Sequence, residues 1–256
     1  MKSIKIIAVA AMMMAATGVS AQFTNTGSRS SNSTADTEGW STLWVEFNPG
    51  TVSPKKGDGE SFTGLSIGYS KAFSLSANIP LFLEAGVGAQ YSFKSLDMGE
   101  ELDDDYYEYC DPSIKYTMIS AKIPVNFMYA WQIPNSSVTL MPFVGINMRF
   151  NIVGNYKFDW NWSDDMIEYF EDRYGSKWED MTEDGIPLGG IDRNLFDEDD
   201  MGKNGTWNRF QIGWHIGVKA RFGKSFMLGA AYGGDFSEVA DGLKVSNGSI
   251  SVGYTF

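Results

Sequence analysis

The sequence has few residues suited to covalent or catalytic chemistry: of its 256 residues, one is a cysteine, Cys110, and one is a histidine, His215. A single cysteine forms no internal disulfide, so the fold must be held by packing or by lipid. Cys110 lies among acids and tyrosines. We expect a plain exposed thiol there, because a reactive thiol needs positive neighbours that lower its pKa. The sequence contains no Gly-x-Ser-x-Gly, His-Glu-x-x-His, Cys-x-x-Cys or phosphate-loop motif, so we expect no enzyme and no cofactor.

Long hydrophobic runs and positive charge are also scarce. Residues 6–18 form an apolar run shorter than the roughly 20 residues that a spanning helix needs. This run follows Lys2 and Lys5 and precedes small residues, which is typical of an export signal peptide over 1–21. Residues 22–39 predict a flexible leader, and 40–256 remain as one folded domain. The net charge of −12 argues against nucleic acid as a partner.

What the sequence does have is alternation of apolar and polar residues, the pattern of a β-strand with two unlike faces. Several runs exceed the about 5–6 residues usual in soluble proteins and reach the about 9–11 of a transmembrane strand. Eight such runs occur, at 40–48, 62–73, 81–93, 117–131, 138–152, 208–222, 226–235 and 245–256.

The connections between these runs alternate in length. Short ones lie at 74–80, 132–137 and 223–225, and long ones lie at 49–61, 94–116, 153–207 and 236–244. Short periplasmic turns and long external loops are typical of an outer-membrane barrel, and an even strand number leaves both termini periplasmic. The sequence therefore predicts an all-β fold: an eight-stranded antiparallel up-and-down transmembrane β-barrel with long external loops.

The two faces of the runs predict which side meets lipid. One face is almost entirely aliphatic and aromatic, and its rings are too many to fill a narrow lumen, so we expect it to face outer-membrane lipid. Its aromatic residues gather at the two ends of the runs, as interfacial belts do. The other face mixes glycine and serine with charges and is expected to line a lumen without a diffusion pore. The predicted lumen network consists of Glu46, Glu84, Lys122, Arg149, Arg209, His215, Lys219, Arg221 and Asp235.

Charges buried in such a lumen need partners, because an unpaired buried charge is costly. We expect two pairings across the lumen: Glu84 with Lys219 or Arg221, and Glu46 with Arg149 or Arg209. The network has five bases and three acids besides its histidine. Water or an anion is therefore expected to serve the remaining bases.

Residues 249–256 alternate in polarity and end in Phe256. The segment resembles the C-terminal assembly signal of Gram-negative outer-membrane proteins, with matching positions at Ile250, Val252, Tyr254 and Phe256. Segments 122–126 and 142–150 are similar to the small Gram-negative outer-membrane protein β-barrel domain family, which are porin-like eight-stranded barrels. The resemblance implies an outer-membrane location and the barrel-assembly machinery as a partner. The porin-like name implies little about function.

Acidic residues concentrate in two loops: 23 of the 32 lie in 94–116 and 153–207. One interpretation is a solvated, self-repelling cell-surface face. Another is divalent-cation binding, since Ca²⁺ takes several oxygen ligands. The Ca²⁺ candidates are Asp197, Asp199 and Asp200, although Met201 stands where a calcium loop would need an oxygen ligand.

Loop 153–207 is too long for a mere connector. Within it, residues 164–181 carry aromatic residues at near-helical spacing and predict a short amphipathic helix packed over the barrel mouth. Its rings would either form a small core within the loop or offer an aromatic surface to a glycan, host or neighbouring protein.

Two functions from different classes fit these features. The first is a structural or surface-display barrel whose acidic external loops contact a partner through 94–116 and 153–207. The alternative is a narrow channel or small-ligand-binding barrel whose basic lumen takes an anion or solute; a soluble lipocalin-like binder is a third possibility.

Overall fold

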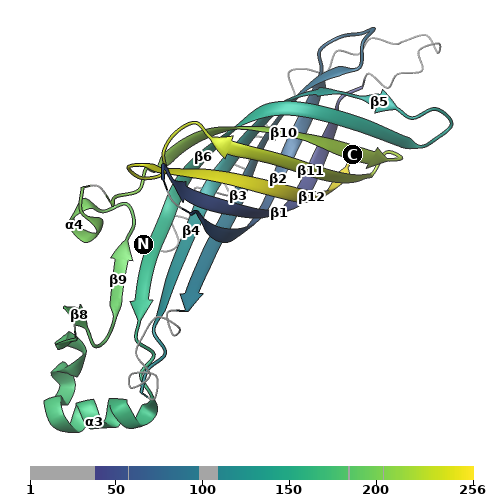
Figure 1. The fold of residues 1–256 in the computed structure, drawn as a ribbon. Coiled ribbons are helices and arrows are strands. Elements are labelled where there is room, and N and C mark those ends of the chain that lie inside the picture. Colours follow the sequence, from purple (N-terminus) through teal and green to yellow (C-terminus); the bar gives the residue numbers. More distant parts are fainter. Residues whose placement is uncertain (1–37, 57, 98–108, 184, 204) are drawn as a thin grey trace.

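The structure is a computed structural model that describes residues 38–56, 58–97, 109–183, 185–203 and 205–256. The predicted signal peptide and nearly all of the predicted leader lie outside these residues. Long antiparallel strands dominate the chain (Figure 1). The barrel strands are β1 (Trp40–Pro54), β2 (Glu60–Ser74), β3 (Leu81–Asp97), β4 (Ser113–Tyr129), β6 (Val138–Asp159), β10 (Phe210–Phe222), β11 (Phe226–Asp235) and β12 (Leu243–Thr255).

Each barrel strand pairs antiparallel with the next one along the chain, and β12 pairs with β1. Val45 lies opposite Val252 in that closing pair. Beyond it, Ser41 and Phe256 exchange backbone N–H···O bonds of 2.9 and 3.0 Å. Closure gives every barrel strand two neighbours, which removes the exposed edges of an open sheet. The predicted closed eight-stranded up-and-down barrel is confirmed.

Several strands run further than alternation predicts. β4 and β6 stay paired out to Ser113 and Asp159, and β3 continues to Asp97. The extra residues are largely polar, such as Lys115 opposite Lys157. Where both faces of a strand meet water, alternation disappears although the backbone ladder continues. The predicted loop 94–116 is therefore too long at both ends, and the predicted loop 153–207 is too long at its start, whereas β10 (Phe210–Phe222) begins two residues later than predicted.

The apolar face of the barrel points outward. On β1, Leu43 and Val45 are 53 % and 55 % exposed, whereas Thr42 between Ser41 and Leu43 is 2 % exposed. The same inversion runs around the barrel, with buried serine, asparagine and charged side chains inside. A surface of this kind is stable against lipid, which needs only apolar contact.

None of the helices in the described part of the chain is both long enough and apolar enough to cross a membrane.

The two ends of the barrel differ. The short connections 75–80, 133–137 and 223–225 lie at one end, here called the turn end, where the two-residue strand β5 (Trp131–Gln132) pairs with β6. The long connections lie at the other end, the loop end. There the β4–β6 hairpin continues as an arm, defined as residues 109–115 and 155–194 (Figure 1).

The arm contains helix α3 (Asp164–Tyr174) and the 3₁₀ helix η3 (Gly175–Asp180). Ser163 is the N-cap of α3, and Gly175, with φ of 65°, ends it. The sequence predicted a helix here and placed it over the barrel mouth. The helix is confirmed, but the placement is wrong: α3 lies beyond the barrel, past the extended ends of β4 and β6 (Figure 1).

Short elements complete this region of the chain. They are β7 (Thr182–Glu183), β8 (Ile186–Pro187), β9 (Ile191–Asn194), which pairs with β6, and α4 (Glu198–Met201).

The arm has a small apolar core of its own. Phe158 and Trp160 are buried in it together with Cys110. The indole of Trp160 donates to the carbonyl of Pro187 at 3.0 Å, and Phe170 of α3 packs edge-on against Trp162, 5.1 Å between ring centroids. Phe170 and Trp178 therefore join a core within the arm, the first of the two alternatives, whereas Tyr169 and Tyr174 of the same segment are exposed.

Cys110 is 5 % exposed, so the expectation of an exposed thiol is wrong. Its backbone forms a β-bridge with Trp162, which carries the side chain into the arm core. Burial, and then the neighbouring Asp111, raise the pKa of the Cys110 thiol above its ordinary value.

Candidate functional site

The lumen is filled in layers, and the layer nearest the turn end is apolar. Trp40 and Phe82 meet there, with ring centroids 4.6 Å apart, and Met128, Met141 and Met227 pack around them. All five side chains are buried. We call this set the lumen plug, because it occupies the end of the lumen with apolar side chains.

Above the plug, Glu84 is the centre of a buried polar cluster. It forms an ion pair with Lys219 across the lumen, one of the two partners that the sequence allowed. Ser70 donates to its Oε1 at 2.8 Å, and Asn126 donates to its Oε2 at 2.7 Å. Three donors from three other strands thus hold one carboxylate that is 2 % exposed.

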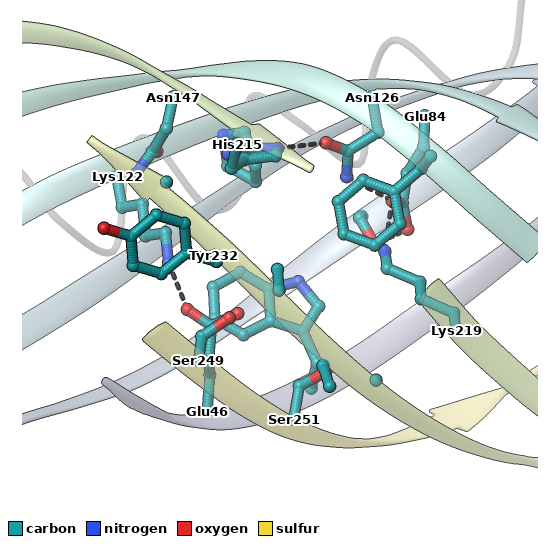
Figure 2. A pocket seen from close by; sticks show the side chains of 18 of the residues that line it. Glu46, Glu84, Lys122, Asn126, Asn147, His215, Lys219, Tyr232, Ser249 and Ser251 are labelled. Atoms are coloured by element: carbon teal, nitrogen blue, oxygen red, sulfur yellow. Dashed lines mark hydrogen bonds and ion pairs between the residues drawn. The ribbon is translucent and has the colours of Figure 1, made fainter. Parts of the chain in front are cut away.

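A second ion pair joins Glu46 to Lys122, which face each other in Figure 2. The sequence paired Glu46 with Arg149 or Arg209 instead, and the structure differs. Lys122 lies over the Trp44 ring at 5.7 Å. Periodicity assigned Lys122 to the lumen but carries no information on the height of each strand in the barrel, and height decides which charges meet.

Arg149 pairs with Asp235, and this third ion pair lies closest to the loop end. Arg209 is not in the lumen: it is exposed, stacks on Phe196 at 4.4 Å and donates to the carbonyl of Ile152 at 3.2 Å. It precedes β10, so the alternation that gave it an inward position does not apply to it. Arg221 lies beside the lumen plug, with its guanidinium 4.4 Å from the Trp40 ring.

His215 faces the lumen, as the alternation predicted. Its Nε2 contacts the Asn126 side-chain oxygen (Figure 2). Its ring meets that of Phe143 edge-on, with 5.6 Å between ring centroids. Asn126 therefore connects His215 to the Glu84 cluster. Among the described residues, no Ser, Cys or acidic side chain forms a hydrogen bond with His215. Its surroundings are those of a packed lumen residue.

The space left among the ion pairs is small. The central cavity, lined by Glu46, Glu84, Lys122, Lys219 and their neighbours, has a volume of about 70 Å³. The Trp44 indole lies at the height of this cavity and packs against Gly68 of β2 and Gly88 of β3. A Cβ added at Gly88 would come within 2.7 Å of the indole. The lumen holds ion pairs and a ring here rather than a continuous channel.

The acidic candidates for Ca²⁺ serve the chain itself. Asp197 caps α4 by accepting from the backbone N–H of Asp199 at 3.0 Å, and Asp200 accepts from that of Asn194 at 2.8 Å. Among the residues that the structure describes, no cluster of three or more acids, histidines or cysteines could hold a metal ion. Most acids of loop 94–116 lie outside the described residues.

The predicted assembly segment lies on the outer face of the barrel. The side chains of Ile250, Val252, Tyr254 and Phe256 all point outward and are 48–64 % exposed. Tyr254 and Phe256 stack at 6.2 Å between ring centroids, at the turn end. Recognition of this segment by the barrel-assembly machinery stays a prediction.

The fold and the outward apolar face agree with the comparisons. The model of a family described as the outer membrane protein beta-barrel domain matches residues 19–234. The chain belongs to this family. Membership places it among outer-membrane barrels of Gram-negative bacteria. Among curated proteins, no match to the chain is found.

The chain also resembles solved structures at low sequence identity. Ail, the attachment invasion locus protein of Yersinia pestis, is 16 % identical over 86 % of this chain and 99 % of its own, with a TM-score of 0.40. Neisserial surface protein A is 14 % identical over 84 % and 95 %, with a TM-score of 0.38. The N-terminal barrel of Pseudomonas aeruginosa OprF is 11 % identical over 83 % and 97 %, with a TM-score of 0.28. Identities this low say nothing about function.

Proposed function

We propose that this protein is a closed outer-membrane barrel that displays its acidic arm at the cell surface for contact with a partner. The observation that carries the proposal is the contrast between the two parts of the chain. The lumen is filled by the lumen plug and by three ion pairs, whereas the arm stands clear of the barrel mouth (Figure 1).

The construction of the arm supports display. A loop without a function is usually short, and one of this length normally carries a binding or lid role. This arm has its own buried rings and tryptophan hydrogen bonds, so it holds a defined shape away from the membrane. In its helix α3, the side chains of Asp164, Asp165, Glu168 and Glu171 are all exposed to solvent. This negative surface favours a positively charged partner.

The orientation is tested by thiol labelling on intact cells. A single thiol is introduced on the arm as Glu171→Cys, or at the turn end as Ser225→Cys, in each case with Cys110→Ala. A membrane-impermeant maleimide is expected to label the arm thiol on intact cells and the turn-end thiol only after the outer membrane is permeabilised. Labelling in the opposite order would contradict surface display.

The alternative, a narrow channel, is tested by the purified protein in planar lipid bilayers. A closed lumen predicts no steady conductance, because the central cavity is of about 70 Å³ and the lumen plug lies between it and the turn end. Steady single-channel currents that become more frequent as more protein is added, and that are absent from protein-free bilayers, would favour the channel. They would overturn the closed-barrel part of the proposal.

A further inference from the structure

A second and larger cavity lies at the loop end of the barrel, above the Arg149–Asp235 ion pair. Its volume is about 470 Å³, within the about 300–1,000 Å³ range of small-molecule sites. Its wall is largely apolar, with Leu96, Met118, Leu195, Trp207 and Val245 among the lining residues. We call it the mouth pocket.

One side of the mouth pocket is lined by Leu195, Met201, Gly205 and Trp207, here called the cover, and both ends of this cover are held in place. Leu195 accepts a backbone bond from Trp207 at 2.7 Å and donates one to Gly154 of β6 at 3.0 Å. The Trp207 ring stacks on Tyr116 of β4, with centroids 6.3 Å apart. The cover is therefore tied to the barrel wall, and the pocket exists without a ligand to shape it.

The floor of the pocket has one unusual side chain, Gln211 of β10. Its side chain is fully buried, and within the described residues neither its Nε2 nor its Oε1 has a hydrogen-bond partner. Two other polar lining side chains are engaged: Arg149 binds Asp235, and Ser92 accepts from Gln90 at 2.9 Å. Burying an unpaired amide costs free energy, so a group that has one donor and one acceptor to offer Gln211 would be held there.

We propose that the mouth pocket binds a small, neutral, largely apolar molecule that carries one group able both to donate and to accept a hydrogen bond, such as a primary amide. The apolar wall takes the body of the molecule, and Gln211 pairs with its polar group. A neutral ligand fits because two nearby ion pairs, Arg149 with Asp235 and Lys94 with Glu60 at 3.3 Å, are already formed, and the further lining acid, Asp58, is exposed to solvent. This site lies apart from α3 and does not depend on the display role of the arm.

The test uses two probes of nearly equal shape, 2-naphthamide and 2-methylnaphthalene, in equilibrium dialysis against the full barrel in lipid nanodiscs. Empty nanodiscs measure partition into lipid. The variants are Gln211→Leu, which keeps the bulk but removes both polar atoms, and Ile216→Leu on the lipid face as the matched control. Heat-modifiable gel mobility verifies that each variant is assembled.

We expect 2-naphthamide to bind the wild type and Ile216→Leu above the empty-nanodisc level. Gln211→Leu should weaken this binding by about tenfold, the combined size of two modest net hydrogen bonds. Gln211→Leu should bind 2-methylnaphthalene at least as well as the wild type does. If that variant fails to assemble, Met118→Trp replaces it and should weaken both probes by filling the pocket. Equal 2-naphthamide binding by wild type and variant, or none above empty nanodiscs, would overturn the proposal.

Discussion

Single residues decide how the narrow lumen is filled, and Trp44 shows this most directly. The indole occupies space that only glycines on the neighbouring strands leave open, Gly68 and Gly88. It also lies beneath the ammonium group of Lys122, at 5.7 Å from ring to nitrogen. A glycine-rich inner face thus has a steric reason here, since a side chain at either position would meet the ring.

Replacing Gly88 with valine tests this packing. The added side chain meets the backbone oxygen of Ile67 and the Trp44 indole, and overpacking of this kind costs about 1–3 kcal/mol. We expect the temperature at which the folded band converts to the unfolded band on SDS gels to fall. Ala89→Val, the next residue, whose side chain points toward lipid, is the control and should leave that temperature unchanged; equal effects of the two variants would contradict the packing argument.

The Glu84–Lys219 ion pair is a second residue-scale prediction. Because the Glu84 carboxylate is buried, Lys219→Met leaves it uncompensated and should lower the free energy of unfolding in lipid vesicles by about 3 kcal/mol. Adding Glu84→Gln should restore much of the loss, because the amide keeps an acceptor for Asn126 or Ser70 and carries no charge.

Urea titration of the single and double variants measures this coupling. Lys224→Met, an exposed lysine in the turn after β10, is the matched control and should change stability little. If the double variant is no more stable than Lys219→Met alone, the uncompensated charge of Glu84 is not the cause of the lost stability.

At the scale of elements, the arm behaves as an appendage with its own core. The lumen plug and the arm core share no residue, and they lie at opposite ends of the barrel strands. α3 packs through Phe170 onto Trp162 and Trp178 of the arm, with ring centroids 5.1 and 5.6 Å apart. The barrel should therefore fold without the distal arm.

Replacing residues 160–189 with an Asn-Gly turn tests that independence. The pairing of Phe158 with Ile191 remains, so the shortened β6–β9 hairpin can close over two residues. We expect the shortened protein to keep its heat-modifiable mobility. Loss of the folded band would show that the arm takes part in barrel assembly.

The thiol of Cys110 reports on the arm core. Burial and Asp111 raise its pKa, and the thiolate is the reactive form, so maleimide labelling of the folded protein should be slow at neutral pH and should accelerate only above the ordinary thiol range. The exposed thiol of Glu171→Cys with Cys110→Ala is the control and should label at the usual rate. Equal rates at pH 7 would mean that the arm core opens readily.

At the scale of the whole molecule, the barrel is closed in three layers: the lumen plug at the turn end, the ion pairs at mid-height and the mouth pocket at the loop end. The outward face carries the apolar side chains that lipid requires. This order places the mouth pocket at the loop end and separates it from the turn end by paired charges and packed rings.

Much of the barrel could be predicted from alternation alone. The run 226–235 coincides with β11, and the inward phase of Glu84 and Lys219 follows directly from the polar face. The partner of Glu46 could not be predicted, because it depends on the register of strands that are distant in sequence. Alternation correctly placed Gln211 on the inner face of its strand, but nothing in the local sequence distinguished it from other polar lumen residues.

The sequence by itself determined the strand count, the face that meets lipid and the alternation of short turns with long connections, because each follows from a repeat of two residues and the length of each run. The tertiary structure alone decided which lumen charges meet, that Arg209 lies outside the lumen, that Cys110 is buried and that α3 stands clear of the mouth. These features depend on register, on strand extensions without alternation and on side chains brought together from distant strands, and none of them leaves a local pattern in the chain.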